Sequence, residues 1–486
     1  MLKISEIFNL EKSQRELDFV DIDIEVDLPL FLDPYFLSLR TDSWSIDAHR
    51  TIQSFFYQVT DLYKANRKED AKKLFVNLSE PNETCFGVSE GKPRGRGVGK
   101  DEAIEIFDNI MSSQAIEQGL VGHLEDMVIF IDNIGKDKIS DLTTNIIRKH
   151  LIEYTQTQCK LHGISLTQSV PSGFYWNPTL RKWDNEHTDM LVIEDRIILL
   201  VPKSIVTYSY KYTPDRYCQH FVLNFLQNEH IRINSSLVKR KKLKNGSEKK
   251  WVPKKDIADA EKTFRKEYLR DFTKKHPEIF NEFRNSTKKK MSPLTHDQLE
   301  KESDFDINDF IDLLIKRLEQ IPKGRKTAGE YHRHILGIME FIFYPKLTRP
   351  IIEQDIHEGR KRIDISFDNS ADSGFFYQLH ASKDIPSQFI FVECKNYASE
   401  VANPEIDQLS GRFSPNRGKF GILVCRSIGD MNRFLERCAD TYHDHRGMII
   451  PLVDDDFIFL LNEIKNNKEN PEEELLAERL RKIILR

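Results

Sequence analysis

Cysteine is scarce in this chain, and its cysteines are widely spaced. The 486 residues include six cysteines, and none of them form a Cys-x-x-Cys pair. Such spacing excludes a dense disulfide framework and the usual ligand pattern of a structural zinc site. The sequence therefore predicts a reduced, cytoplasmic protein with free thiols at Cys85, Cys159, Cys218, Cys394, Cys425 and Cys438.

Long apolar runs and a strong excess of positive charge are also missing. No run approaches the roughly 20 apolar residues of a membrane helix, and residues 1–10 are already mixed with polar side chains. We therefore expect neither a membrane segment nor a secretory signal. The formal net charge of −5 excludes a uniformly basic surface, whereas local basic patches, which phosphate binding requires, remain compatible with it.

The length indicates several domains, because a single domain usually holds about 100–200 residues. The pattern predicts an N-terminal α+β region of unknown role over 1–256, as a sensor or a nucleic-acid-binding part, and a helical connector over 257–324. An α/β domain follows over 325–465, and a C-terminal helix over 466–486 is expected to dock or to serve in association. The boundary at 320–327 contains Pro322 and Gly324.

Residues 18–27 alternate acidic and apolar side chains. Alternation with a period of two is typical of a half-buried strand whose acidic face is wet. The alternative is a cation site formed by Asp21, Asp23, Glu25 and Asp27. We favour the strand.

Residues 91–100 form a glycine-rich basic segment that ends in Gly99-Lys100. A P-loop would need Gly at position 94 and Ser or Thr at position 101, where this chain has Arg94 and Asp101. We therefore predict a mobile basic loop, and contact of Arg94, Arg96 and Lys100 with phosphate remains an alternative.

Residues 238–256 are strongly basic and are centred on Asn245-Gly246, a signal for a type I′ hairpin turn. The sequence predicts a basic β-hairpin. Such a ribbon either lies along a nucleic-acid backbone or is only solvated, as runs of like charge often are. The predicted nucleic-acid contacts are Lys241, Lys242, Lys249 and Lys250.

Two segments of the C-terminal region read as strands that carry charged residues. Residues 362–367 alternate, which places Asp364 on the face opposite Ile363 and Ile365. Residues 389–395 are apolar almost throughout, as in a strand buried on both faces, yet they include Glu393 and Lys395 on one side. Charges at such a position are costly to bury unless they pair or bind a metal.

Other elements surround these strands. Helical periodicity predicts a helix over 328–343, and Asn403 with Pro404 predicts a helix start that carries Gln408 and Arg412 on one stripe. Strands are expected over 420–425 and 448–453, with a helix over 430–442 between them. Residues 369–388 are expected to form a loop or an extra hairpin.

The pattern of Asp364 followed by Glu393-Cys394-Lys395 resembles the PD-(D/E)XK, or restriction-endonuclease-like, nuclease superfamily. Ile363 stands where the family name has proline, and Glu393 follows Asp364 by 29 positions. The resemblance covers about residues 325–460. It implies an α/β fold with an αβββαβ core, preceded here by the N-terminal α+β region and the helical connector.

The resemblance also implies a metal-dependent active site. Asp364, Glu393 and the carbonyl of Cys394 would hold Mg²⁺, for which Mn²⁺ would substitute, because hard cations prefer oxygen ligands. Lys395 would position or help deprotonate the attacking water and stabilise the transition state. Asp368 lies outside the motif, and Asp368→Asn is expected to leave the cleavage rate nearly unchanged.

Further residues complete the implied site. Gln408 would orient water or phosphate from its helix, and Arg412 and Arg360 would contact the nucleic-acid backbone. The superfamily often supplies another carboxylate from its first core helix, for which Glu330 is the first choice and Glu340 the second. Glu330 is equally explained as an acidic residue favoured at a helix N-terminus.

These implications predict a Mg²⁺-dependent DNA endonuclease of prokaryotic anti-phage or restriction defence. The alternatives are a ribonuclease, a nuclease gated by a signal that the N-terminal region senses, and a catalytically inactive DNA-binding module. The expected partners are DNA, a second copy in a homodimer or higher homo-oligomer, and proteins of a defence operon.

Overall fold

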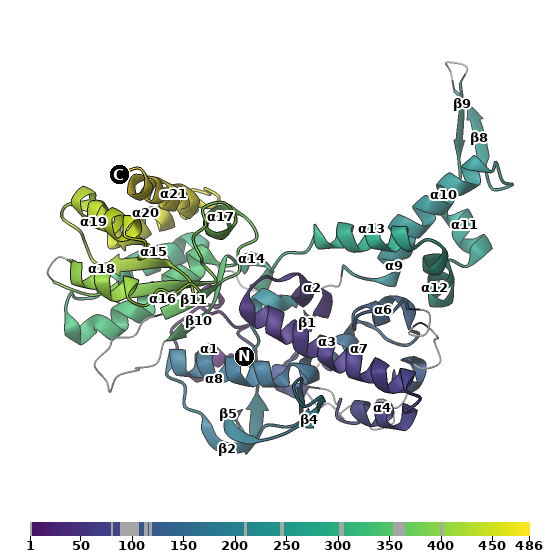
Figure 1. The fold of residues 1–486 in the computed structure, drawn as a ribbon, viewed down its shortest axis with the longest axis horizontal. Helices are drawn as coiled ribbons and strands as arrows, with labels where there is room; N and C mark the ends of the chain where they lie inside the picture. The colour runs from purple at the N-terminus through teal and green to yellow at the C-terminus, as the bar shows by residue number, and fades with distance from the viewer. Residues whose placement is uncertain are drawn as a thin grey trace.

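The computed structural model describes residues 2–78, 81–87, 106–110, 115, 119–208, 211–243, 247–300, 306–352, 365–398, 401 and 403–486. The chain folds into two α/β bodies, each around its own hydrophobic core. One core is built from residues between Ile4 and Leu294, the other from residues between Phe310 and Ile483 together with Leu161. Figure 1 shows the bodies side by side and a helical arm that projects from the N-terminal one.

The N-terminal body is mostly helical. Its longest helix, α3 (Ser43–Lys64), begins where the Asp42 side chain accepts a hydrogen bond from the N–H of Ser45, and its buried face packs into the core. Small sheets pair β2 (Thr167–Pro171) with β5 (His187–Ile193), β5 with β6 (Arg196–Ile198), β3 (Tyr175–Asn177) with β4 (Lys182–Asp184), and β1 (Phe31–Leu32) with β7 (Val206–Thr207). The other helices are α1 (Ile4–Ile7), α2 (Pro34–Leu39), α4 (Lys68–Phe75), α6 (Asp126–Phe130), α7 (Lys136–Ile146) and α8 (Arg148–His162).

Residues 18–27 do not form the predicted strand. They are irregular, with isolated bridges at Phe19 and Asp23. Their acidic side chains are not on a wet face, because Asp18, Asp21 and Asp23 are buried. Asp21 accepts hydrogen bonds from the N–H and hydroxyl of Ser5, at 2.9 and 2.6 Å. Residues 18–24 are buried on both sides of the chain, so the alternation does not mark a wet face there. Within the described ranges, no group of three His, Cys, Asp or Glu side chains could hold a metal ion.

The arm follows the N-terminal body along the chain. It consists of α9 (Pro214–Tyr217), α10 (Leu223–Arg232), α11 (Lys254–Glu261), α12 (Lys266–Lys275) and α13 (Pro277–Lys288), with a hairpin of β8 (Lys239–Lys242) and β9 (Glu248–Trp251) at its tip. Part of the segment predicted as a connector contributes to the first core through Ile257, Leu269 and Phe283. None of the helices in the described ranges is long and apolar enough to cross a membrane.

The C-terminal body contains a mixed sheet in the order β10-β11-β12-β13-β14. The first three strands pair antiparallel, and β12, β13 and β14 pair parallel. The strands are β10 (Leu347–Ile352), β11 (Ile365–Asn369), β12 (Phe389–Lys395), β13 (Phe420–Cys425) and β14 (Met448–Val453). The accompanying helices are α15 (Ile307–Gln320), α16 (Ala328–Phe343), α17 (Gly374–Ala381), α18 (Asn403–Ser410), α19 (Met431–His443), α20 (Asp454–Lys465) and α21 (Pro471–Ile484).

Most elements predicted for this region are confirmed, including the helix over 328–343 and the strands over 389–395, 420–425 and 448–453. The prediction of a loop or hairpin over 369–388 is wrong, because α17 lies there. Phe375, Phe376 and Leu379 of α17 are buried in the second core. Their spacing places them on one face of a helix, a signal that would have identified α17.

Arg349 of β10 joins the two bodies through buried charges. Its guanidinium donates to Oδ2 of Asp368 in β11, at 3.0 Å from Nε and 2.8 Å from Nη2, and pairs with Asp42 at the start of α3. Its backbone N–H donates to Oδ1 of Asp18 at 2.9 Å. The hydroxyl of Tyr154 donates to the other oxygen of Asp18 at 2.7 Å. Asp368 therefore has a structural partner in Arg349, and the expectation that Asp368→Asn leaves the cleavage rate nearly unchanged stays a prediction.

A second buried pair connects α16 with the N-terminal body. Glu340 lies 3.6 Å from the ammonium of Lys203, and both side chains are almost fully buried. Burial, reinforced by the charge of Asp18, raises the pKa of Glu340 to about 8. Burial also lowers the pKa of Lys203. Glu340 thus serves the contact between the bodies.

Replacing Arg349 with methionine should destabilise the protein by about 3–5 kcal/mol, because buried Asp368 would lose its cation and buried Asp42 would keep only Arg40, at 3.6 Å. Asp368→Asn should cost about 1–3 kcal/mol, because Arg349 keeps Asp42. Unfolding in urea, followed by circular dichroism, measures both. Arg433, exposed on α19, provides the control: Arg433→Met should change the midpoint little, and an equal effect of all three substitutions would contradict this account.

Replacing Glu340 with glutamine should make stability less dependent on pH. A carboxyl whose folded pKa is about 8, above its ordinary value of 4.5, contributes stability below the lower value that is lost as pH rises through the higher one. Glutamine does not titrate. In urea titrations, the stability of Glu340→Gln relative to wild type should therefore increase as the pH rises between these two values; Glu319→Gln, on the exposed face of α15, is the control.

Candidate active site

The carboxyl end of β12 brings two charged side chains into the interior. Glu393 and Lys395 are both buried, and they share one side of the strand because they are two residues apart. Cys394 between them faces the second core, and burial, reinforced by the Glu393 carboxylate, raises the pKa of its thiol. The thiol therefore stays neutral, and only the backbone carbonyl of Cys394 remains available as a metal ligand.

Glu393 lies between two cations. The ammonium of Lys395 donates to its Oε1, and the guanidinium of Arg412 lies 3.1 Å from its Oε2. Lys395 also donates to the amide oxygen of Gln408 at 3.1 Å. Gln408 lies on α18 and Arg412 two residues after its end. The structure thus brings together Glu393, Lys395, Gln408 and Arg412, with Arg412 on the carboxylate.

The segment before α16 is attached to the residue that follows the motif. The side-chain amide of Asn396 donates to the carbonyls of Pro322 and Gly324 and to the hydroxyl of Thr327, each at 3.0 Å. The N–H of Gly324 donates back to the carbonyl of Asn396 at 2.9 Å. These bonds fix the exit of β12 and therefore the direction of Lys395.

Two predicted site residues, Asp364 and Arg360, lie outside the described residues. Ile365, which follows Asp364 in the chain, pairs with Val392, which precedes Glu393. Glu330 is exposed in the first turn of α16. It lines a pocket of about 270 Å³ whose other residues come from the N-terminal segment, α15 and α16.

Glu340, the second choice for a carboxylate from the first helix, does not fit that role. It is directed to Lys203 of the N-terminal body, as described above. The helical periodicity of α16 predicted which of its faces is apolar. It did not predict which surface of the protein its polar residues pack against. That surface depends on how the two bodies associate, so the sequence of α16 alone did not reveal it.

A neighbouring cluster at the same edge of the sheet was not predicted. Lys395 lies opposite Cys425 and Cys425 opposite Val453 in the parallel register, so the residues that follow β13 and β14 lie near the motif. Nε of Arg426 lies 2.9 Å from Asp454, which accepts a hydrogen bond from Tyr331 at 2.7 Å. Burial raises the pKa of Asp454 to about 6.

The signal for this cluster was present in the sequence. Arg426 and Asp454 directly follow two predicted strands, and the carboxyl ends of parallel strands form the usual ligand-binding edge of a sheet. Tyr397 was also overlooked: the ammonium of Lys395 lies 6.0 Å from the centre of its ring.

The basic hairpin is confirmed as a hairpin. Lys241 pairs with Lys249 and Arg240 with Lys250, and the lysines of both strands are exposed. The predicted Asn245-Gly246 turn lies outside the described residues, as does the basic loop with Arg94, Arg96 and Lys100. Lys239 pairs with Asp256 of α11 at 2.8 Å, which attaches the base of the hairpin to the arm.

The donor set at β12 is compatible with a hard cation in part. Glu393 and the carbonyl of Cys394 supply oxygen, the ligand type that Mg²⁺ prefers. Both oxygens of Glu393 contact cations in this arrangement, so a metal ion would have to compete with Lys395 and Arg412. The fit therefore depends on a further carboxylate, the role predicted for Asp364.

The comparisons with known proteins concern the other half of the chain. A family model described as a domain of unknown function (DUF8370) matches residues 9–213. No curated protein and no solved structure matches the chain. The matched residues include Asp18, Asp42 and Lys203, which contact the C-terminal body, but they end before the arm and before β12.

Proposed function

We propose that this protein is a metal-dependent nuclease that hydrolyses phosphodiester bonds of DNA at the carboxyl end of β12. The observation that carries the proposal is the buried pair of Glu393 and Lys395, with Gln408 on the ammonium. A buried charged pair at the carboxyl end of parallel strands, the usual ligand-binding edge of such a sheet, is a candidate functional site.

The strand register supports a second carboxylate in this site. Because β11 and β12 are antiparallel and Ile365 pairs with Val392, we propose that Asp364 and Glu393 face the same substrate. The order of elements from α16 to β13 also supports the proposal. With α17 set aside as an insertion, it is helix, three strands, helix, strand, which is the core order that the resemblance to PD-(D/E)XK nucleases implies.

In this proposal Asp364, Glu393 and the carbonyl of Cys394 hold Mg²⁺. When bound, the ion would neutralise the phosphodiester charge and lower the pKa of a water molecule. In this structure, the guanidinium of Arg412 helps to neutralise the Glu393 carboxylate. We propose that Arg412 contacts a DNA phosphate once the carboxylate has another cation, since a guanidinium matches phosphate geometry as well as carboxylate geometry.

Lys395 has the central role among the protein groups. Its ammonium is held between Glu393 and Gln408, so it is oriented before a substrate arrives. An oriented cation stabilises the charge that develops on the phosphate in the transition state. Gln408 would position the attacking water or a phosphate oxygen through its amide.

The test is cleavage of plasmid DNA and of RNA with Mg²⁺, Mn²⁺, Ca²⁺ or EDTA. Wild type should cut DNA with Mg²⁺ or Mn²⁺ but hardly with Ca²⁺, whose looser coordination misplaces the water. Asp364→Asn, Glu393→Gln and Lys395→Met should each lose at least about a hundredfold in rate. If the protein cuts RNA but not DNA, the substrate is RNA and the proposed DNA substrate is wrong. Full activity in EDTA would refute the metal mechanism.

Stability must be measured beside the rate, because Glu393 is paired with two buried cations. Glu393→Gln should cost about 3–5 kcal/mol of stability. Lys395→Arg keeps a cation beside Glu393, but its guanidinium is planar and always charged. It therefore neither places its charge where the ammonium lies nor takes a proton from water, so the variant should fold normally and still lose activity. Glu319→Gln, an exposed change on α15, is the matched control. Wild-type rates in folded Lys395→Arg and Asp364→Asn would refute the assignment.

The hairpin gives a separate prediction about binding. Replacing Lys241, Lys242, Lys249 and Lys250 with alanine should weaken DNA binding and reduce its salt dependence, by about 0.9 in the log–log slope for each phosphate that the protein no longer neutralises. Fluorescence anisotropy at several salt concentrations measures both quantities. Four exposed lysines outside the hairpin, Lys64, Lys182, Lys316 and Lys383, make the control variant; equal slopes for the two variants would show a merely solvated hairpin.

A further inference from the structure

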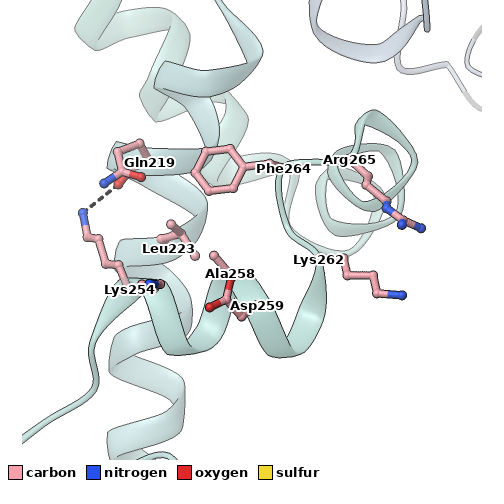
Figure 2. A pocket seen from close by; sticks show the side chains of 9 residues that line it. Gln219, Leu223, Lys254, Ala258, Asp259, Lys262, Phe264 and Arg265 are labelled. Carbon is pink, nitrogen blue, oxygen red and sulfur yellow. Dashed lines mark hydrogen bonds between the residues drawn. The ribbon is translucent and has the colours of Figure 1, made fainter.

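A pocket of about 450 Å³ lies in the arm, between α10, α11 and the segment that leads into α12. Its volume falls within the range of about 300–1,000 Å³ that is typical of ligand sites. Figure 2 shows an apolar floor made by Leu223 and Ala258, with the ring of Phe264 beside it. The site is remote from β12, and the nuclease mechanism does not use it.

Phe264 is an exposed aromatic ring on an anchored segment. Its side chain is 45 % exposed. The preceding residue, Thr263, is fully buried, and the thiol of Cys218 lies 3.4 Å from its carbonyl and 3.4 Å from its hydroxyl. The ring is therefore presented to solvent by a fixed backbone. Such a ring is a stacking platform for a nucleic-acid base.

The charges around the pocket are mainly positive and lie on both sides of the ring. Lys254 lies on one side, where its ammonium donates to the carbonyl of Gln219 at 2.6 Å. Lys262 and Arg265 extend on the other side. Asp259 is the acidic residue of the lining, and its carboxylate can accept a hydrogen bond from a base or sugar.

We infer that this pocket binds one nucleotide of a single-stranded nucleic acid, with the base on Phe264 and the flanking phosphates on the two groups of cations. Cations on both sides match a strand that passes across the ring, whereas a free nucleotide would use one side only. The basic hairpin adjoins the pocket, because Lys239 pairs with Asp256 of α11, the helix that also carries Ala258 and Asp259 of the lining. An acidic peptide would match the charge but would not need the exposed ring.

The experiment measures binding of a labelled oligothymidylate and of an abasic oligonucleotide of equal length by fluorescence anisotropy in EDTA. Wild type should bind the oligothymidylate about tenfold more tightly than the abasic strand, since stacking on an aromatic side chain contributes at this scale. Phe264→Ala should abolish that preference. Phe459→Ala, at a ring that is 48 % exposed on α20, should retain it.

The charge contribution is tested with the same probes. Lys255 also lines the pocket, next to Lys254 in the chain. Lys255→Gln with Lys262→Gln should weaken the binding of both oligonucleotides, compared with the exposed control pair Lys64→Gln and Lys274→Gln. Free thymidine monophosphate should compete only weakly with the oligothymidylate. If the monophosphate binds more tightly than the oligothymidylate, the ligand is a free nucleotide and not a strand. Three results would overturn the inference. They are equal affinity of wild type for the two oligonucleotides, no effect of Phe264→Ala on the preference, and competition by polyglutamate as strong as that by unlabelled oligothymidylate.

The choice of nucleic acid as the ligand rests on the proposed function, but the two fail separately. Binding is measured without metal, so cleavage plays no part in it. A protein that binds through Phe264 and never cuts would support the pocket and refute the nuclease. A protein that cuts DNA but binds both oligonucleotides equally would support the nuclease and refute the pocket.

Discussion

The contact between the Glu393 carboxylate and two buried cations is the constraint on which the edge of the C-terminal sheet depends. A buried carboxylate without compensation would cost several kcal/mol. Its partners come from β12 itself and from the residue just beyond α18, so the same contact also fixes α18 against the sheet. Gln408 then receives the ammonium of Lys395. The position of a helix and the orientation of the proposed catalytic groups therefore follow from one requirement of charge balance.

Buried charges also pair at the interface of the two bodies, where they serve to hold the bodies together. Arg349 and Lys203 are as deeply buried as Lys395, and their carboxylate partners belong to the opposite body or to an adjacent strand. These pairs are enclosed by two packed bodies, whereas Glu393 and Lys395 lie where the parallel strands end. Burial of charge alone is therefore no sign of a functional site in this protein, and the proposal for Glu393 and Lys395 rests on their place in the topology.

The difference explains how much the sequence could predict. The apolar run before Glu393 identified β12, and Asn403 with Pro404 identified the start of α18, because both signals are local. Gln408 and Arg412 were predicted to share one helical stripe, and both contact the charged pair at the strand end. Arg349 and Asp18, which are more than 300 positions apart, meet only after both bodies have folded. No local pattern distinguishes Glu340, which faces Lys203, from a carboxylate that faces a metal ion, and the acidic residues of 18–27 were misassigned for the same reason.

The arm and the sheet edge lie far apart in the molecule (Figure 1). A short oligonucleotide could therefore occupy the Phe264 pocket or the β12 site, but not both. A longer strand held by the hairpin and the pocket would be presented to β12 at a raised local concentration, set by the length and stiffness of the nucleic acid between the two sites. A rigid interface is necessary for such coupling, because a loose contact between the bodies would let the arm move independently of the sheet. The buried contacts of Arg349 with Asp42 and of Lys203 with Glu340 supply that rigidity, and they connect the family-matched N-terminal residues with the proposed chemistry of the C-terminal body.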